Sequence, residues 1–252
     1  MTQIQYCSDL HLEFPANRAY ILEHPIEAQA EVLVMAGDIL TLSTLDRFDW
    51  FFDDISTKFK QVYWIAGNHE YYNSDIGNRS GSFEEKIRDN ILFLNNRMVE
   101  IDGTGLFFTT LWSRLSEENQ AYVTQSLNDF RLIKNRGKAL STSHYNAMHL
   151  ENLQFLEKSL EEGPAKKVVV THHVPTYHNY PVHYLGDPLN EAFATDLGEL
   201  MKKHAPNYWI FGHHHFNPGP FKIGDTTLLT NQLGYVGMGE HRLYSPTAVL
   251  EL

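Results

Sequence analysis

Short apolar runs recur along this chain, and five of them lead directly into Asp, Asn or His residues. Each run has the length and composition of a buried strand. Longer stretches with apolar residues at helical spacing lie between the runs, so the chain alternates strands with helices and predicts an α/β fold. The polar clusters that follow the five runs are Asp9-Leu10-His11, Gly37-Asp38, Gly67-Asn68-His69-Glu70, Thr171-His172-His173 and Gly212-His213-His214-His215.

The alternation predicts an order of elements. Strands are expected at residues 2–8, 32–36, 62–66 and 105–112, in the run KVVVTHH (167–173), at 208–211 and in a β-rich remainder that turns at Gly224-Asp225. Apolar spacing predicts helices at 44–60, through the 120s, at 144–162 and at 190–204.

Capping patterns place the starts of two helices. Ser82, with Glu85 three residues later, forms a capping box that predicts a helix ending near Asn96. Ser143 is the expected cap of the helix at 144–162. The apolar face expected for that helix consists of Leu150, Leu153, Leu156 and Leu160.

Composition restricts the domain count, the compartment and the partners. The 252 residues show no internal repeat, linker or charge block, so we expect a single domain over 1–252. The one cysteine, Cys7, has no partner for an internal disulfide, and the N-terminus lacks a signal peptide. A cytoplasmic location with no membrane partner is therefore expected. The net charge of −11 repels polyanions, which disfavours a large nucleic-acid partner.

The 14 histidines and the polar strand ends together indicate metal binding. Carboxyl ends of strands gather at one edge of an open α/β sheet, where ligands bind. Carboxylate, amide and imidazole groups without thiolate suit Mn, Fe or Zn, and Ni or Co is also compatible. Two ions about 3.5–4 Å apart promote in-line displacement at phosphorus. The candidate ligands, sufficient for two ions if one carboxylate bridges them, are Asp9, His11, Asp38, Asn68, His172, His213 and His215.

Local spacing supports this grouping. His11 and His215 each lie two residues from another candidate ligand. In an extended chain, residues i and i+2 point to the same side, so we expect each pair to reach one cluster. Glycines at positions 37, 67 and 212 allow tight turns and a close approach of the backbone to an ion or a phosphate.

The motifs, taken in order, are similar to those of a known superfamily. The set D-x-H, GD, GNH[DE], H and GHxH over residues 9–215 resembles the calcineurin-like metallophosphoesterases. The chain after Gly37-Asp38 lacks the Val-Asp-Arg-Gly continuation of serine/threonine protein phosphatases, which disfavours that activity. Segments that resemble small bacterial-type members are LWSRL (111–115), NDFRLIK (128–134), DPLN (187–190) and NQLGY (231–235).

The resemblance implies a fold and a set of residue roles. The fold is a four-layer α/β/β/α sandwich with two facing, mixed β-sheets. A metal-bound hydroxide would attack phosphorus, and His69 would act as the catalytic residue that protonates or positions the leaving oxygen, or contacts the phosphate. The implied metal ligands are Asp38 as the bridge, Asp9, His11 and His215 for the first ion, and Asn68, His172 and His213 for the second.

Several neighbouring residues have more than one interpretation. His172 and His173 compete for one ligand position, and the family's strand-Thr-His pattern favours His172. Glu70 is expected to anchor its loop, and Glu13 to support a ligand or form a salt bridge. Asp129 is interpreted as the anchor of a helix end.

Candidate substrate contacts are Arg114, Arg131, His178 and His214. Arginine forks match phosphate oxygens, although a solvated surface role is an equal alternative for both arginines. His214 occupies the variable position of GHxH, and His178 lies in the long loop at 174–189.

Two long loops, 71–81 and 174–189, follow polar clusters and are placed to overhang a site. Ordinary loop packing is nevertheless the favoured interpretation of their tyrosines, which are Tyr71, Tyr72, Tyr177, Tyr180 and Tyr184. The histidines expected at the surface are His24, His144, His149, His204 and His241.

These observations favour a dinuclear metal-dependent enzyme that hydrolyses a small phosphodiester. A phosphomonoesterase with the same mechanism is the first alternative. A non-catalytic scaffold is a second, and it is disfavoured because the full set of candidate ligands and His69 is present. A nuclease is a third, and it is disfavoured because Arg79 is the only Lys or Arg in the two long loops.

Overall fold

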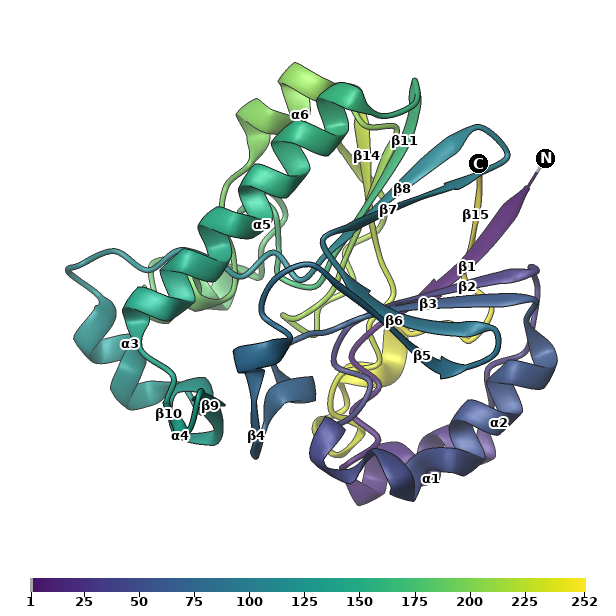
Figure 1. Ribbon diagram of the computed structural model, residues 1–252, viewed down its shortest axis with the longest axis horizontal. Coiled ribbons are helices and arrows are strands. Elements are labelled where there is room, and N and C mark those ends of the chain that lie inside the picture. The colour runs from purple at the N-terminus through teal and green to yellow at the C-terminus, as the bar shows by residue number, and fades with distance from the viewer. Residues whose placement is uncertain (1) are drawn as a thin grey trace.

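Two six-stranded sheets face each other in this computed structural model, which describes residues 2–252 (Figure 1). The first sheet has the order β15 (Val249–Glu251), β1 (Gln3–Cys7), β2 (Val32–Ala36), β3 (Gln61–Ile65), β6 (Ile91–Asn95) and β5 (Phe83–Arg88). The second has the order β13 (Phe221–Ile223), β14 (Thr226–Thr230), β12 (Tyr208–Phe211), β11 (Lys166–Thr171), β8 (Thr104–Thr109) and β7 (Arg97–Ile101).

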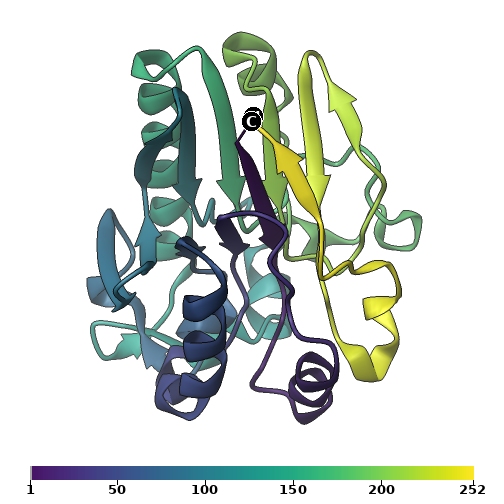
Figure 2. The ribbon, with the colours of Figure 1, turned by 90° about the vertical axis from the view of Figure 1, so that its right-hand side faces the viewer.

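Both sheets are mixed, with parallel strands at their centres. In the first, β1, β2, β3 and β6 run parallel, and β15 and β5 pair antiparallel at the two edges. Figure 2 shows β15 beside β1, so the beginning and the end of the chain share one sheet. In the second, β8, β11, β12 and β14 run parallel between antiparallel edges.

Helices cover the outer face of each sheet. The helices α1 (Pro15–Glu23) and α2 (Asp49–Lys58) lie against the first sheet, and α5 (Thr142–Glu162) and α6 (Gly198–His204) lie against the second (Figure 1). The predicted four-layer α/β/β/α sandwich with two mixed sheets is therefore confirmed. In the described chain, no helix has both the length and the apolar character needed to cross a membrane.

Alternation along the central strands produces three apolar layers. Successive strand side chains point to opposite faces, so Leu33 and Met35 pack toward α1 and α2, while Val34 packs between the sheets. On the second sheet, Val170 faces the other sheet and Val169 faces α5 and α6. Both faces of both sheets are thus buried, which explains why the central strands are continuous apolar runs.

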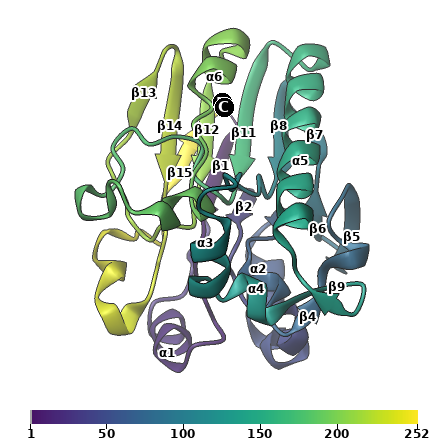
Figure 3. The same cartoon turned by 90° about the vertical axis from the view of Figure 1, so that its left-hand side faces the viewer.

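A small subdomain projects from the sandwich near the carboxyl ends of the central strands (Figure 3). We call residues 120–139 the cap segment. It contains α3 (Gln120–Ser126), α4 (Asp129–Leu132), β9 (Ile133–Asn135) and β10 (Lys138–Ala139). The strand β9 also pairs with β4 (Ser74–Asp75), so the cap segment contacts the predicted loop at 71–81.

The helix predicted at 82–96 is wrong, because this segment is the antiparallel hairpin β5–β6. Phe83 and Ile87 are four residues apart, and that spacing fits one face of a helix as well as one face of a strand. Pairing of β6 with β3 decides the outcome. The Ser82 hydroxyl donates to the Asn96 carbonyl across the open end of the hairpin and does not cap a helix.

Other predicted helices differ in their bounds. The stretch 44–60 is a 3₁₀-helix at Leu42–Phe48 followed by α2, and 190–204 divides into a 3₁₀-helix at Pro188–Ala192 and α6. The cap of α5 is Ser141, not Ser143. Leu150, expected on its apolar face, is 54% exposed. The shorter 3₁₀-helices are His69–Tyr71, Ile76–Asn78, Val182–Tyr184, Val236–Met238 and Glu240–Leu243.

Candidate metal centre

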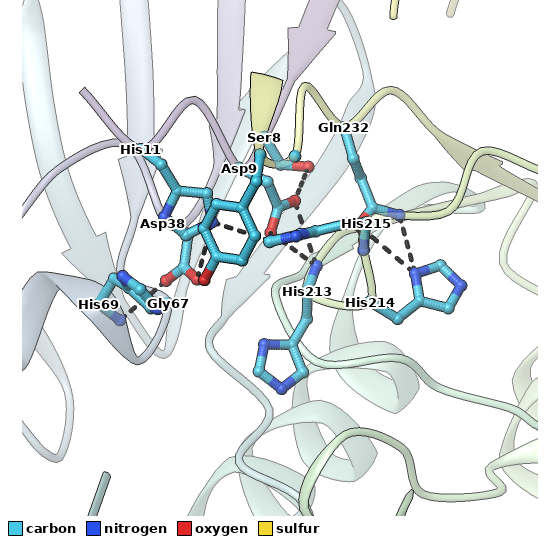
Figure 4. Close-up of polar contacts among 12 residues, drawn as sticks. Ser8, Asp9, His11, Asp38, Gly67, His69, His213, His214, His215 and Gln232 are labelled. Carbon is cyan, nitrogen blue, oxygen red and sulfur yellow. Dashed lines mark hydrogen bonds and ion pairs between the residues drawn. The ribbon is translucent and has the colours of Figure 1, made fainter. Parts of the chain in front are cut away.

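The candidate ligands meet where the two sheets bring their carboxyl ends together. Asp9 and His11 follow β1, Asp38 follows β2, and all three belong to the first sheet. His172 follows β11, and His213 follows β12 of the second sheet. Figure 4 shows Asp9, Asp38, His11 and His215 turned toward a common space, which they reach from the ends of three strands.

Three groups of these side chains place their ligand atoms within 4.8 Å of one another: Asp9, His11 and His215; Asp38, His172 and His213; and His11, Asp38 and His69. The Asp38 carboxylate belongs to the second group and also approaches His11 of the first. Its Oδ2 atom is 3.7 Å from His11 Nε2 and 3.4 Å from His172 Nε2. This arrangement suits a carboxylate shared by two ions.

Ring nitrogens that follow different strands approach each other within these groups. His11 Nε2 is 2.9 Å from His215 Nε2, and His172 Nε2 is 3.0 Å from His213 Nδ1. In each of the four rings the other nitrogen contacts an oxygen, and that contact fixes the orientation expected of a metal-ligating histidine. The oxygens belong to Glu13 for His11, Glu240 for His215, the Ala36 carbonyl for His172 and the Ala192 carbonyl for His213.

Asn68 tests whether this residue set fits metal ions. Its amide nitrogen donates to Asp129 Oδ1 at 2.9 Å and to the Tyr72 hydroxyl at 3.1 Å. Its Oδ1 atom is buried and has no hydrogen-bond partner. A buried acceptor without a donor is costly unless a cation completes it. The unpaired oxygen, together with the paired imidazoles, fits a centre for two divalent cations.

The backbone at this centre is unusual. Five of the seven candidate ligands have positive φ angles, a region that non-glycine residues rarely adopt and that clusters at functional sites. They are Asp9 (57°), His11 (46°), Asp38 (54°), His213 (82°) and His215 (50°). The chain at these ligands is therefore not extended, so the predicted reason for the alignment of residues i and i+2 is wrong. Asp9 and His11 do meet, whereas His213 and His215 join different groups.

Glu70 holds the turn that carries these residues, as expected. Its carboxylate accepts hydrogen bonds from the backbone N–H groups of Asp38, Ile39 and Gly67 and from Trp64 Nε1. Burial and the Asp38 charge raise the pKa of Glu70 to about 8, although its donors oppose the shift.

Steric constraints require glycine at positions 67 and 212. A Cβ atom at Gly67 would collide with the Asp38 carboxylate and the His172 ring, and one at Gly212 would lie 2.5 Å from Asp9 Oδ2. Close backbone approach therefore serves the ligands themselves.

His69 lines the cavity beside both groups. Its Nδ1 atom is 2.8 Å from Glu13 Oε1, and its backbone N–H donates to Asp38 Oδ1. Its ring lies against Tyr72 with centroids 4.1 Å apart. Burial acts to lower the pKa of His69, but the Asp38 and Glu13 carboxylates outweigh it and raise that pKa above its usual value. The arrangement can hold a proton on this ring.

The two adjacent histidines of the second sheet differ in environment. His172 joins Asp38 and His213, whereas the buried His173 packs its ring 4.2 Å from that of His213. Burial lowers the pKa of His172, but Asp38 and Asp9 outweigh this and raise it to about 9. Burial and the nearby His172 lower the pKa of His173 to about 3.

His215 has the largest upward shift of the candidate ligands. Burial acts to lower its pKa, but the Asp9 and Glu240 carboxylates raise it to about 10. The Glu240 oxygen is 2.8 Å from His215 Nδ1. Sequence reasoning missed Glu240, because it lies 25 residues further along the chain and no motif marks it.

A cavity of about 700 Å³ opens onto the candidate ligands. Part of its wall comes from the cap segment, and part from the predicted long loops. Tyr72, Tyr180 and Tyr184 line it, so ordinary packing is the wrong interpretation for these three tyrosines. Tyr235, within the NQLGY segment, also lines it and places its ring 4.4 Å from that of His215.

The four predicted substrate contacts lie in different places. His214 lines the cavity, and its ring contacts the Gln232 amide at 3.0 Å (Figure 4). Arg114, Arg131 and His178 are exposed and do not line the cavity. The Arg131 guanidinium instead donates to backbone carbonyls at the end of α3. His149, expected at the surface, is buried and contacts the Trp112 carbonyl.

Comparison with known proteins gives a consistent result. The sequence pattern of the family described as calcineurin-like phosphoesterase matches residues 3–217. An uncharacterized protein of Acanthamoeba polyphaga mimivirus is 28% identical over 279 aligned positions, which cover 100% of this chain and 97% of that protein. The phosphopantetheinyl hydrolase of Mycobacterium tuberculosis has a similar fold, with a TM-score of 0.72 at 16% identity over 99% of this chain and 95% of its own.

Proposed function

This chain belongs to the calcineurin-like phosphoesterase family, and from that premise we propose that it hydrolyses a small phosphodiester. Membership makes it a metal-dependent phosphoester hydrolase. The finer assignment concerns which ester it cleaves, which residues hold the ions and which residue handles the leaving group.

We assign seven residues to the metals. Two bound divalent ions would supply a nucleophile at neutral pH and neutralise charge that develops on the phosphoryl oxygens. Oxygen and imidazole donors favour Mn, Fe or Zn, with Ni or Co compatible. The proposed ligands are Asp38 for both ions, Asp9, His11 and His215 for one, and Asn68, His172 and His213 for the other.

His69 is the proposed proton donor to the leaving oxygen. Its side chain lines the cavity, and Glu13 fixes the ring through Nδ1. That contact leaves Nε2 as the nitrogen free to face a substrate. The raised pKa keeps a proton on the ring near neutral pH, which is what general acid catalysis requires.

The absence of lysine and arginine side chains supports a diester over a monoester. Among the described residues, no Lys or Arg lines the cavity. A monoester at neutral pH carries a second negative charge, and sites for such dianions commonly match it with an arginine fork. A diester carries one charge, which the proposed ions can neutralise alone. This observation carries the assignment.

Other features of the chain support the remaining proposals. The three apolar layers run through the whole described chain, which supports a single domain over 1–252. Cys7 is buried and unpaired, which supports a reducing, cytoplasmic location. The proposed substrate is a small molecule, because the cap segment forms one wall of the cavity and the chain is acidic.

The test compares bis(4-nitrophenyl) phosphate with 4-nitrophenyl phosphate in the presence of Mn²⁺, with bound metal measured on the same sample. We expect kcat/KM to favour the diester by about tenfold, because only the monoester has an unmatched second charge. A preference for the monoester would reverse the assignment to a monoesterase. No turnover of either compound by metal-loaded protein would refute both.

A further inference from the structure

The cavity has two chemically different parts. The candidate ligands and His69 form one part, and the other is an apolar wall that we call the outer wall. It comes from the cap segment and from residues 180–193, and its members are Leu127, Leu132, Tyr180, Tyr184, Leu189 and Phe193. The outer wall adjoins the centre directly. The Phe193 ring stacks 4.6 Å from that of His213, and the Tyr180 ring lies 5.6 Å from that of His214.

The carboxylates that line the cavity differ in whether a basic side chain contacts them. Four line it: Glu13, Asp38, Asp187 and Glu240. Glu13 and Glu240 contact histidines of the centre, and Asp38 lies between two of the ligand groups. Within the described chain, Asp187 contacts no histidine, Lys or Arg, and its Oδ1 atom accepts from the Leu189 N–H. Asp187 therefore leaves a negative charge beside the outer wall.

In the part of the chain that the structure describes, no Lys or Arg joins Asp187 in the lining of the cavity. Arg114 and Arg131, the two arginines that the sequence suggested as substrate contacts, are exposed, and neither lines the cavity. A second anionic group on a bound substrate would thus lie among aromatic and aliphatic side chains near Asp187, without a partner. A second anion bound there would lose part of its hydration against the apolar wall, and the exposed Asp187 carboxylate would repel it through solvent.

We propose that the substrate is a phosphodiester whose arm against the outer wall is uncharged and partly apolar, and that Asp187 helps the site to reject arms that carry a second anion. The proposal rests on the proposed function and names its substrate class. It excludes nucleoside polyphosphates, bisphosphates and carboxylated arms as good substrates. Rejection by an unmatched carboxylate is a form of specificity through repulsion.

Two matched substrates test whether the site prefers an uncharged arm. The compounds are 4-nitrophenyl pentyl phosphate and 4-nitrophenyl 4-carboxybutyl phosphate, which share a leaving group and differ in a terminal methyl or carboxylate. We expect metal-loaded protein to show a kcat/KM at least about tenfold higher for the pentyl compound. Equal rates, or a preference for the carboxylated compound, would overturn the proposal.

Asp187→Asn tests the source of the rejection. Asn caps a helix as well as Asp does, so the 3₁₀-helix at Pro188–Ala192 should be retained. We expect the ratio of the kcat/KM values for the two substrates to fall about threefold, mainly because the carboxylated compound is turned over faster. Asp225→Asn is the control, because Asp225 lies in the turn before β14, at the opposite edge of the sheet, and should leave the ratio unchanged. An unchanged ratio in Asp187→Asn would overturn the role of Asp187.

A binding measurement separates this proposal from the proposed function. Pentylphosphonate and 4-carboxybutylphosphonate have C–P bonds that resist hydrolysis. Calorimetric titration of metal-loaded protein with them therefore measures how the arm affects binding affinity, without turnover. We expect pentylphosphonate to bind about tenfold more tightly. If no diester were cleaved but this preference held, the proposed function would fail and the arm assignment would stand. Equal binding of the two phosphonates would overturn the arm assignment whatever the activity.

Discussion

His69 belongs to two arrangements at once, because it lies within reach of His11 and Asp38 and also faces the cavity. As a metal ligand it would be required for loading, whereas as a proton donor it would be required only for turnover. Its Nδ1 contact with Glu13 resembles the support given to a ligand, so geometry alone is compatible with both roles. Metal content and leaving-group dependence distinguish the two.

We expect His69→Ala to retain both metals and to lose about 10²- to 10⁴-fold in kcat on esters with poor leaving groups, the usual contribution of a general acid. Nitrophenyl esters should lose less, because their leaving group needs little protonation. The measurements are elemental analysis of the purified variant and kinetics on alkyl and aryl esters. Loss of one metal would make His69 a ligand, and full activity on alkyl esters would exclude the acid role.

Asp129 contacts the candidate ligand Asn68 directly. Its Oδ1 atom accepts from both the Asn68 amide and the Tyr72 hydroxyl, and the carboxylate is fully buried within the cap segment. The sequence suggested only a helix anchor for Asp129. The structure shows that it fixes the amide so that Asn68 Oδ1 stays free of hydrogen bonds.

Asp129→Ala should weaken binding of the second metal about 10- to 100-fold, as loss of a residue that orients a ligand does. Asp129→Asn retains one acceptor oxygen and should lose less. Calorimetric metal titration of both variants provides the comparison, with circular dichroism as the check on folding. If Asp129→Ala bound two metals with unchanged affinity, the positioning role would be excluded.

At the level of elements, local sequence patterns predict some helices and strands correctly and others wrongly. Central strands such as β2 and β11 are correctly predicted, because a short apolar run flanked by polar residues has few other solutions. The β5–β6 hairpin carries a capping box and an apolar spacing of four, so its local sequence favours a helix. Pairing of β6 with β3 overrides that preference, and it joins residues far apart in sequence.

The start of α5 offers a test of local structure with a matched control. Ser141 accepts a hydrogen bond from the His144 backbone N–H, whereas Ser143 lies inside the helix. We expect Ser141→Ala to lower the free energy of unfolding by about 1 kcal/mol. In a chain of this size the Tm should fall by about 2–4 °C. Ser143→Ala should leave the Tm nearly unchanged in the same calorimetric scan, and an equal loss in both variants would reject Ser141 as the cap.

For the molecule as a whole, the candidate metal centre joins the two sheets. Asp9, His11 and Asp38 come from the first sheet, while His172 and His215 come from the second. Ion binding therefore depends on how the sheets are stacked, and bound ions should stabilise that stacking by mass action.

Proton competition gives the metal affinity a predictable pH dependence. Without metal, His172 has a pKa of about 9 and His215 of about 10, both above the usual value near 6.5. Below these values each ring carries a proton that an incoming ion must displace. Affinity should therefore fall as the pH is lowered from about 9 to 7, by about tenfold per pH unit for each proton released.

Titration of Zn²⁺ against a chelator of known affinity, in buffers of different ionisation enthalpy, measures both the affinity and the protons released. The stability of the metal-free protein should depend on pH in the opposite direction. Raised pKa values contribute stability that is fully present below about pH 6.5 and is lost as the pH rises through 9 and 10. An affinity that did not change between pH 7 and 9 would contradict the raised pKa values.

The sequence by itself determined the strand-and-helix alternation, the ligand types and their order along the chain, because each of these is a local property of short segments. The motifs also indicated the family. The tertiary structure alone decided which ligands face each other, which carboxylates support them and what surrounds the substrate. His172 meets the Ala36 carbonyl across 136 residues, and Asn68 meets Asp129 across 61. Such contacts depend on how the two sheets and the cap segment pack, and no local pattern encodes that packing.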